Sequence, residues 1–558
     1  MATSSSAETQ PPRAAPVNPV LRNALRLSLS ASEYRKLHQY VMKRSPASLK
    51  AKIQDSTPTP DRYGAIVRSS RRADEAGGGS DKYNETAIRA SLRVFLATAS
   101  SLKLFDILKA RLAKGSAPPT KTKTPLHRSP TFRLSLSLSL ILLLHRLLHR
   151  FFTRLRATLL TSSAAPFRER NPRISHALTS KYAPSIGSSA AGFALGIYPD
   201  SGLHASAAIY LGSRAGEFLW NVAEGKGGLL ADWKRPWWVG SWLFMPVSFG
   251  QLFYAFVFER EVVPGWFGQL LFKLTPAYIQ QRPAGFPAEK HWPDGYEIVD
   301  SLAGISAMKW PPFTSPILHP NNPSPLPSSL KSISPITSPA HAALSSLSCA
   351  LLHPSTPSCT TAYLHHNLLS VAQLARPVTF VYLAMSLLSY KRFLSAPFTT
   401  TNALFRKIIT MTLVLSTSVG SAWGSICLFN SLLSRSVLPT KRFFLSGAAA
   451  GLPFAVFARG TGNRAHFLSI FRIALNSAWK IGPKKGMWRR WKGIEVSAFV
   501  LAWALAGCVL EGNPGAVDDL KMRKALAWLR GDGFVDLVEK RKGKKVVKGD
   551  EEKGDKGE

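Results

Sequence analysis

Residues 237–258 read WWVGSWLFMPVSFGQLFYAFVF, a stretch of 22 positions without a charged side chain. An α-helix rises about 1.5 Å per residue, so about 20 mostly apolar residues cross the roughly 30 Å hydrocarbon core of a bilayer. This stretch is long and apolar enough to span a membrane. It therefore predicts an integral membrane protein.

Similar apolar runs occur on both sides of this stretch. Residues 408–432 are uncharged, residues 495–510 carry one charge at their edge, and residues 368–389 are interrupted by Arg376 and Pro377. Shorter apolar runs form two pairs, 182–198 with 203–222 and 443–458 with 466–479. Two weaker apolar runs lie closer to the N-terminus, at 94–108 and 134–152. The pattern predicts an all-α, polytopic membrane helix bundle of about eight to ten spans.

The charge balance is strongly basic, with 71 Lys and Arg against 32 Asp and Glu in 558 residues, a net charge of +39. In a soluble protein this balance would indicate a nucleic-acid partner. Mean hydropathy is nevertheless +0.01 although both ends of the chain are polar, so the apolar residues are concentrated in the middle. We therefore expect the lipid bilayer, including anionic lipids, as the partner, and no nucleic acid.

The composition changes along the chain and indicates five regions. They are a disordered, basic N-terminal region (1–85), a first membrane half (86–305), a Pro/Ser-rich linker (306–347), a second membrane half (348–515) and a polar C-terminal tail (516–558). Within the first region, residues 18–44 predict a basic amphipathic helix with few acidic residues. Such a helix is either a mitochondrial targeting element or, as we favour, a surface helix.

The two halves share landmarks in the same order. Residues 190–192 (AAG) match residues 449–451, and Trp220 matches Trp479, with 259 positions between the members of each pair. A basic aromatic loop, an apolar span and a Glu-x-x-Pro-Gly motif follow in both halves. This order predicts a duplication. Repeated helices often build transport proteins with the functional site between the halves, although repeats also occur without transport.

The two basic aromatic loops are expected to anchor the chain at the membrane surface. Indole rings and cationic side chains are both favoured at the level of the lipid head groups. The residues expected to lie at this interface are Trp233, Lys234, Arg235, Trp488, Arg489 and Arg490.

Small residues dominate the paired shorter runs and predict close packing of helices. In lipid, helices gain little from the hydrophobic effect when they meet, so small residues spaced four apart favour contact between their backbones. Within one chain this is ordinary helix packing; a thin pathway wall and a homo-oligomer contact are the alternatives. The expected packing residues are Gly187, Gly192, Gly196, Gly447 and Gly451.

A few charged residues lie inside the apolar runs. Charges at membrane depth are costly and usually face a bundle interior or a water-filled cavity. Arg214 and Glu217 are three positions apart and could pair on one helical face, and Arg472 occupies nearly the equivalent place in the second half. Two interpretations of these residues and of Arg376 stay open. Either they line a pathway, or the helices lie near the interface and the long arginine side chains extend to the membrane surface.

Cysteine and histidine residues gather after the linker but match no strong zinc signature. Cys349, His353, Cys359, His365 and His366 have the spacing Cys-x3-His-x5-Cys-x5-His, so we expect no metal site. A disulfide between Cys349 and Cys359 remains open. The other two cysteines, Cys427 and Cys508, are interpreted as packing residues. His145 and His149, which lie four apart on a basic helix, are interpreted as interfacial residues.

Residues 188–196 (SSAAGFALG), the turn after them and residues 207–220 resemble the transmembrane protein 135 family, as do residues 352–359 (LHPSTPSC). The likeness covers about residues 85–300 and 345–530. It extends more distantly to the superfamily of mitochondrial inner-membrane translocase channels and to a small peroxisomal membrane protein. The linker and the Ser-Leu run at 134–144 depart from the family. The resemblance implies a multi-pass protein of mitochondria or peroxisomes, linked to organelle dynamics and lipid metabolism.

We therefore expect a channel- or translocase-like membrane protein involved in lipid handling or organelle dynamics, and no enzyme. The sequence contains no nucleophile elbow, Walker loop or His-Glu-x-x-His motif, so no cofactor is expected. Two alternatives stay open. One is a membrane scaffold without transport activity, and the other is a lipid-modifying membrane enzyme, for which the expected His-x4-Asp pattern is missing.

Overall fold

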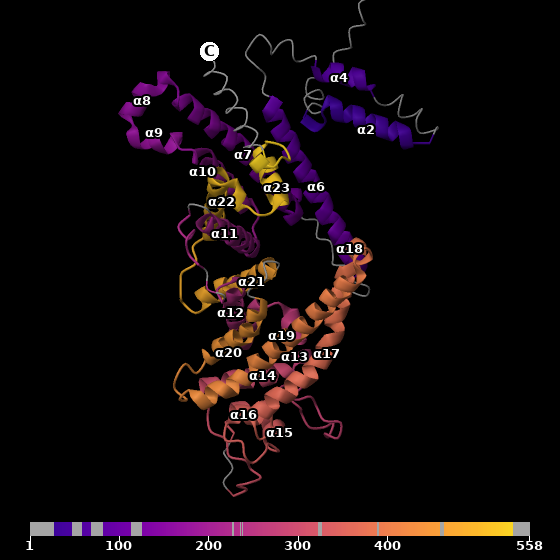
Figure 1. Ribbon diagram of the computed structural model, residues 1–558, viewed down its shortest axis with the longest axis vertical. Helices are drawn as coiled ribbons and strands as arrows, with labels where there is room; N and C mark the ends of the chain where they lie inside the picture. The colour runs from indigo at the N-terminus through magenta and orange to yellow at the C-terminus, as the bar shows by residue number, and fades with distance from the viewer. Residues whose placement is uncertain are drawn as a thin grey trace, which may run out of the picture. The chain divides into compact units, whose positions relative to one another are not determined.

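The computed structural model describes residues 27–46, 58–68, 82–112, 125–225, 228–234, 236, 238–321, 326–387, 390–457 and 463–539. Helices make up most of these ranges (Figure 1). The β-structure found in them is an isolated bridge between Pro312 and Ser346. The expected all-α fold is therefore confirmed for the described part of the chain.

Five helical segments in the described ranges are long and apolar enough to cross a membrane. They are α7 (Pro130–Leu159), η4 with α12 (Ser241–Phe258), α17 (Cys359–Leu387), α19 (Pro397–Leu432) and α22 (Ile494–Gly512). They include the stretch quoted first and the Ser-Leu run, which lies within α7. The expected total of eight to ten spans stays a prediction.

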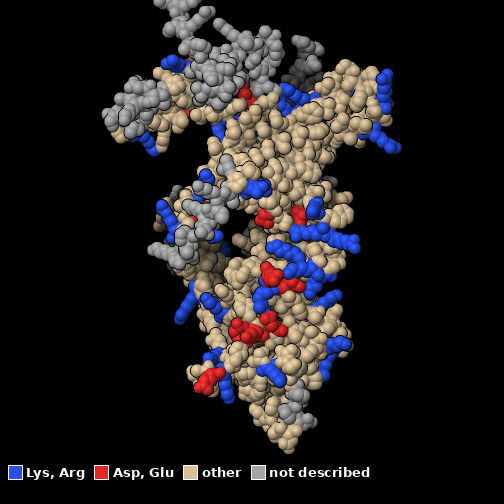
Figure 2. Space-filling model, turned by 180° about the vertical axis from the view of Figure 1, so that it is seen from behind, with Lys and Arg blue, Asp and Glu red and all other residues tan. Residues whose placement is uncertain are grey.

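Large apolar side chains are exposed along these helices, as expected for surfaces that face lipid. Only 17% of the apolar window of α17 is buried, and Leu368 and Phe380 on this helix are 76% and 75% exposed. Figure 2 shows wide areas without charged side chains on one face. Exposed apolar patches of this kind mark a membrane or partner surface rather than contact with water.

The chain divides into two compact units, and the first combines residues 1–231 with residues 493–558. In this unit α7 packs against α6, α10 and η3, and α22 packs against α10 and α11. The helix α23 begins at Asp519, whose side chain accepts a hydrogen bond from the Lys521 N–H, and ends at Gly531 with φ of 92°. Besides α7 and α22, the helices of unit 1 are α2 (Ala31–Arg44), α4 (Pro60–Arg68), α6 (Lys82–Leu112), η1 (Leu126–Arg128), η2 (Ser162–Ala164), α8 (Ala165–Arg170), α9 (Pro172–Thr179), α10 (Ala183–Ser189), η3 (Ala190–Ile197), α11 (Ser201–Glu224), η9 (Pro514–Ala516) and α23 (Leu520–Arg530).

The second unit comprises residues 232–492. Here α17 and α19 run side by side (Figure 1), α19 packs against α20, and α12 packs against α20 and α21. Besides α17 and α19, the helices of unit 2 are η4 (Ser241–Leu243), α12 (Phe244–Phe258), η5 (Arg260–Val262), α13 (Gly265–Leu274), α14 (Gly295–Ala307), η6 (Ser328–Ile333), α15 (Ser334–Thr337), α16 (Leu347–Leu352), α18 (Tyr390–Ser395), α20 (Arg442–Gly451), η7 (Leu452–Phe457) and α21 (Arg464–Lys484).

The units do not follow the sequential halves expected from the sequence. The helix α12 follows α11 in sequence but belongs to unit 2, and α22 follows α21 but belongs to unit 1. Unit 2 therefore contains α12 from the expected first half, and unit 1 contains α22 from the expected second half. In both units this helix packs against a short α-helix, which continues into a 3-10 turn, and against the long helix after it.

Three regions differ from their expected character. The Pro/Ser-rich segment is folded over residues 326–347, where Leu330, Ile333 and Ile336 are buried in the main apolar cluster of unit 2. Of the expected tail, residues 520–530 form α23, while residues 540–558 lie outside the described residues. The N-terminal region was expected to be disordered apart from one helix, but it also contains α4 and the start of α6. The helix α2 occupies the second part of the expected amphipathic helix, and residues 18–26 lie outside the described residues.

Candidate functional site

Unit 1 contains a cavity of about 280 Å³ with mostly apolar walls. Its largest wall is one face of α22, where Phe499, Trp503, Ala506 and Leu510 recur at helical spacing. The helices α11 and α23 contribute further lining residues. The remaining lining residues are His145, Ser185, Ala207, Tyr210, Leu211, Gly507, Leu526, Leu529 and Arg530.

Gly507 brings two walls of the cavity together. A Cβ atom built on Gly507 would lie 3.0 Å from the Cβ of Ser185, closer than ordinary van der Waals contact. The absent side chain therefore lets α22 approach α10 directly.

The polar wall of the cavity is a paired network. The Arg530 guanidinium donates to Glu511 Oε1 at 2.6 Å, to Ser185 Oγ at 3.2 Å and to the Gly507 carbonyl at 3.3 Å. Arg530 is 8% exposed, so this pairing offsets the cost of burying its charge. The His149 Nε2 atom lies 3.8 Å from the same carboxylate oxygen of Glu511.

His145 lies beside this network and is buried. Its Nδ1 atom lies 3.2 Å from the Ser188 carbonyl oxygen, and its ring packs against Trp503 in a tilted arrangement with the ring centroids 5.0 Å apart. The expectation that His145 is an interfacial residue is therefore wrong. The burial of His145 could not be predicted from the sequence, because it depends on the approach of α10 and α22 to this face of α7.

The residues expected to line a pathway are not gathered in either unit. Arg214 donates to Glu217 at 2.8 Å in unit 1, as their spacing predicted. Arg376 and Arg472 belong to unit 2, where Arg376 is exposed on α17 and Arg472 is partly buried on α21. Their proposed role therefore remains a prediction.

Four of the five glycines expected at helix contacts lie at such contacts. A Cβ atom would meet the Phe152 ring at Gly187, Val500 at Gly192, the Phe249 carbonyl oxygen at Gly447, and the Pro246 backbone at Gly451. Among the described residues, no atom lies within 4 Å of this position at Gly196, which is exposed near the end of η3. Gly196 therefore makes no such contact within the described part of the chain.

The basic aromatic loops differ in their exposure. Trp233 is 43% exposed, Lys234 is exposed, and Arg235 lies outside the described residues. In the second loop Arg489 and Arg490 are exposed. Trp488 instead covers Gly482, and its ring stacks on Trp479 at 5.8 Å. This partly buried indole packs within unit 2, and its role as a membrane anchor remains a prediction.

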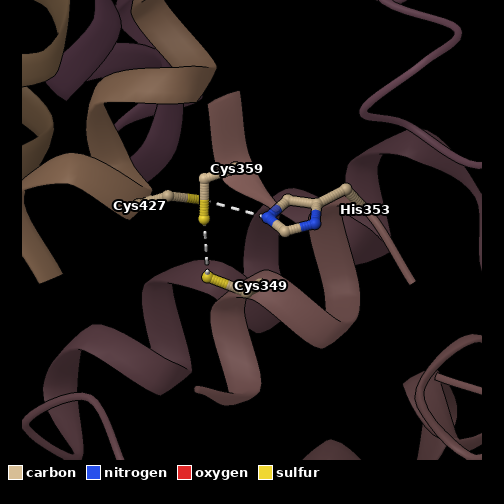
Figure 3. A group of neighbouring side chains, drawn as sticks. All are labelled: Cys349, His353, Cys359 and Cys427. Atoms are coloured by element: carbon tan, nitrogen blue, oxygen red, sulfur yellow. Dashed lines mark hydrogen bonds between the residues drawn. The ribbon is translucent and has the colours of Figure 1, made fainter. Parts of the chain in front are cut away.

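Unit 2 brings together a group of four side chains with sulfur and nitrogen donors (Figure 3). They are Cys349, His353, Cys359 and Cys427, whose donor atoms all lie within 4.8 Å of one another. Sequence reasoning missed this group because Cys427 was interpreted as a packing residue. His365 and His366 are not part of it, and His366 packs against Tyr278.

The four side chains come from three elements. Cys349 lies on α16, His353 follows that helix, Cys359 begins α17, and Cys427 lies near the end of α19. All the cysteines are free thiols, and Cys359 is the most accessible of the group. His353 is 2% exposed and Cys349 and Cys427 are buried as well, so the donor atoms face one another in a largely dry environment.

No protein-family model matches the chain, and neither the curated proteins nor the solved structures contain a match.

Proposed function

We propose that this protein is a multi-pass membrane protein that handles lipids and holds one acyl chain in the cavity of unit 1. The observation that carries the proposal is the cavity of about 280 Å³ between α11, α22 and α23, whose walls are almost entirely apolar. Small-molecule sites are concave and mostly apolar, with a few polar groups that fix orientation. The size is near the lower limit for such sites, so a chain fits better than a bulky ring system.

The polar wall favours an uncharged occupant. Glu511 already neutralises Arg530, and Ser185 takes a further guanidinium hydrogen bond. A free anion would have to compete with this carboxylate inside a buried environment. The acyl part of a neutral or zwitterionic lipid does not compete with this carboxylate, because it only replaces other apolar contacts.

The proposal includes two repeated halves that exchange a helix. Ser185 and Phe444 are 259 positions apart, and each lies against a glycine of the exchanged helix, Gly507 and Gly250, respectively. The same spacing relates Gly192, which meets Val500 of α22, to Gly451, which meets Pro246 of α12. Matching contacts at matching positions support a duplication. Together with the resemblance described above, they support a channel- or translocase-like, non-enzymatic role in a mitochondrial or peroxisomal membrane.

Labelling with a photoactivatable acyl chain tests the proposed site. The full chain is reconstituted in phosphatidylcholine liposomes in which the probe lies on the acyl chain, and labelled peptides are mapped by mass spectrometry. We expect label on α11 and α22 around the cavity. Leu211→Trp should reduce this label several-fold by filling the cavity, while Leu219→Trp, at a 44% exposed position on the same helix, should not.

The same liposomes separate transport from the alternatives. A translocase should accelerate lipid or solute flux over empty liposomes, and Arg214→Ala or Arg472→Ala should alter that flux. Labelled but flux-inactive protein would leave a lipid-binding scaffold. Consumption of a lipid substrate would indicate an enzyme. Label that is spread evenly over all apolar helices, and unchanged in Leu211→Trp, would contradict the proposed cavity.

A further inference from the structure

We propose that Cys349, His353, Cys359 and Cys427 form a structural zinc site in unit 2. The donor set is three sulfurs and one imidazole nitrogen, and its four atoms lie within 4.8 Å of one another (Figure 3). Zinc in proteins prefers tetrahedral sites of this composition. Soft thiolates exclude magnesium and calcium, which take oxygen ligands.

The distances between the donor atoms of the four side chains fit the edges of a tetrahedron around zinc. With Zn–S bonds of about 2.3 Å and Zn–N bonds of about 2.05 Å, two sulfurs lie about 3.8 Å apart, and a sulfur and a nitrogen lie about 3.6 Å apart. The sulfurs of Cys349 and Cys359 are 3.8 Å apart. The sulfur of Cys427 is 3.6 Å from Nε2 of His353. The other edges are at most 4.8 Å, so shifts of about 1 Å would close the site.

The imidazole of His353 is already held in the orientation that a ligand needs. Its Nδ1 atom lies 3.0 Å from the Thr356 carbonyl oxygen, to which a protonated Nδ1 donates. This leaves Nε2 as the atom that faces the sulfurs. Histidine ligands of metals commonly donate their second N–H to a carbonyl or carboxylate in this way.

The local backbone explains why Cys349 and His353 lie together. They are four positions apart at the end of α16, and the His353 N–H donates to the Cys349 carbonyl at 2.9 Å. Pro354 prevents the helix from continuing, and a turn closed by the Thr356 N–H on the His353 carbonyl leads to Cys359. Two ligands thus come from a helix end and the third from the start of the next helix.

The fourth ligand gives the site its structural role. Cys427 is 3% exposed on α19, so the ion would join α16, α17 and α19 at one end of the α17–α19 pair. Four protein ligands leave no open position for a substrate, which is typical of structural rather than catalytic zinc. A Cys349–Cys359 disulfide would use only two of the four donors and would leave the placement of Cys427 and His353 unexplained.

Metal analysis of the purified full-length protein tests the site. With reductant present throughout, we expect about one zinc ion per chain by plasma mass spectrometry. Cys349→Ser and Cys427→Ser should lower the zinc content at least tenfold. Cys508→Ser is the matched control, because Cys508 lies in unit 1 outside the group, and it should keep the full content.

Two further measurements keep the result clear if a serine variant does not fold. His353→Cys should retain zinc with four thiolates, whereas His353→Ala should lose it to a chelator at a concentration that the wild type withstands. In the wild type, alkylation of Cys349, Cys359 and Cys427 should begin only after chelation. Folded wild-type protein without zinc and with these thiols freely alkylated, or with a Cys349–Cys359 disulfide in protein purified without reductant, would overturn the proposal.

Discussion

Glycine contacts set how closely individual helices approach in this protein. At Gly447 and Gly451 an added methyl group would meet the backbone of α12, at the Phe249 carbonyl and at Pro246, respectively. Backbone atoms cannot move aside as the end of a side chain can. At Gly196 the same methyl group would meet nothing within 4 Å. Glycines in similar small-residue patterns therefore differ in whether they tolerate an added methyl group.

Gly451→Ala should lower the free energy of unfolding by about 1–3 kcal/mol, because the new methyl group overpacks the α20–α12 contact. Gly196→Ala should change it by less than about 0.5 kcal/mol, as expected for an exposed position. Thermal unfolding of both variants in the same detergent makes the comparison. Equal stability of the two variants would show that α20 does not contact α12 as described.

The candidate site shows what spacing alone could and could not predict at this scale. The Arg214–Glu217 pair was predictable, because residues three apart share a helical face. Cys349 and His353 were recognised as donors, but zinc signatures depend on local spacing, and the fourth donor, Cys427, lies on a distant helix. Only the packing of α19 beside α17 brings Cys427 to the group.

At the scale of elements, the exchange of α12 and α22 organises each unit. The helix α22 lies against α10 and α11, and α12 lies against α20 and α21. In unit 1 this exchange makes the cavity, since Phe499 and Trp503 of α22 form one wall. The network around Arg530 then fastens α23 to α22 through Glu511.

Cysteine cross-linking tests the α22–α10 contact. In a Cys508→Ser background, Ser185→Cys with Gly507→Cys should form a disulfide on mild oxidation, because the two Cβ positions are 3.0 Å apart, close to the roughly 3.5–4.5 Å of disulfides. Ser185→Cys with Leu501→Cys is the control, since Leu501 is 63% exposed on α22. The linked peptides are identified by mass spectrometry. Two free thiols in the first variant would contradict the exchange.

Hydropathy predicted the long spans but not which helices they pack against. The five candidate spans coincide with apolar runs, since length and composition decide whether a helix can cross lipid. The run at 182–198 is instead divided into α10 and η3, with the change at Ala190. Hydropathy could not predict the exchange of α12 and α22, because the apolar face of a helix has the same hydropathy whichever helix it packs against. The buried Pro/Ser segment was missed because its composition is typical of linkers.

Across the whole molecule, large apolar side chains are exposed on the long helices, as expected for a protein whose surrounding solvent is lipid. Leu368 and Phe380 of α17 and Phe398 of α19, which is 91% exposed, would face water in a soluble protein. In a bilayer the same side chains face hydrocarbon at no cost. The net charge of +39 is consistent with that setting, since anionic head groups attract cationic side chains.

Alkaline carbonate extraction of membranes from cells that express the full chain tests this claim most directly. Carbonate strips peripheral proteins from membranes, whereas helices that span hydrocarbon remain. We predict that the protein stays in the membrane pellet and is released only by detergent, together with an integral marker protein. Recovery of folded protein in the carbonate supernatant, with the marker still in the pellet, would contradict the account.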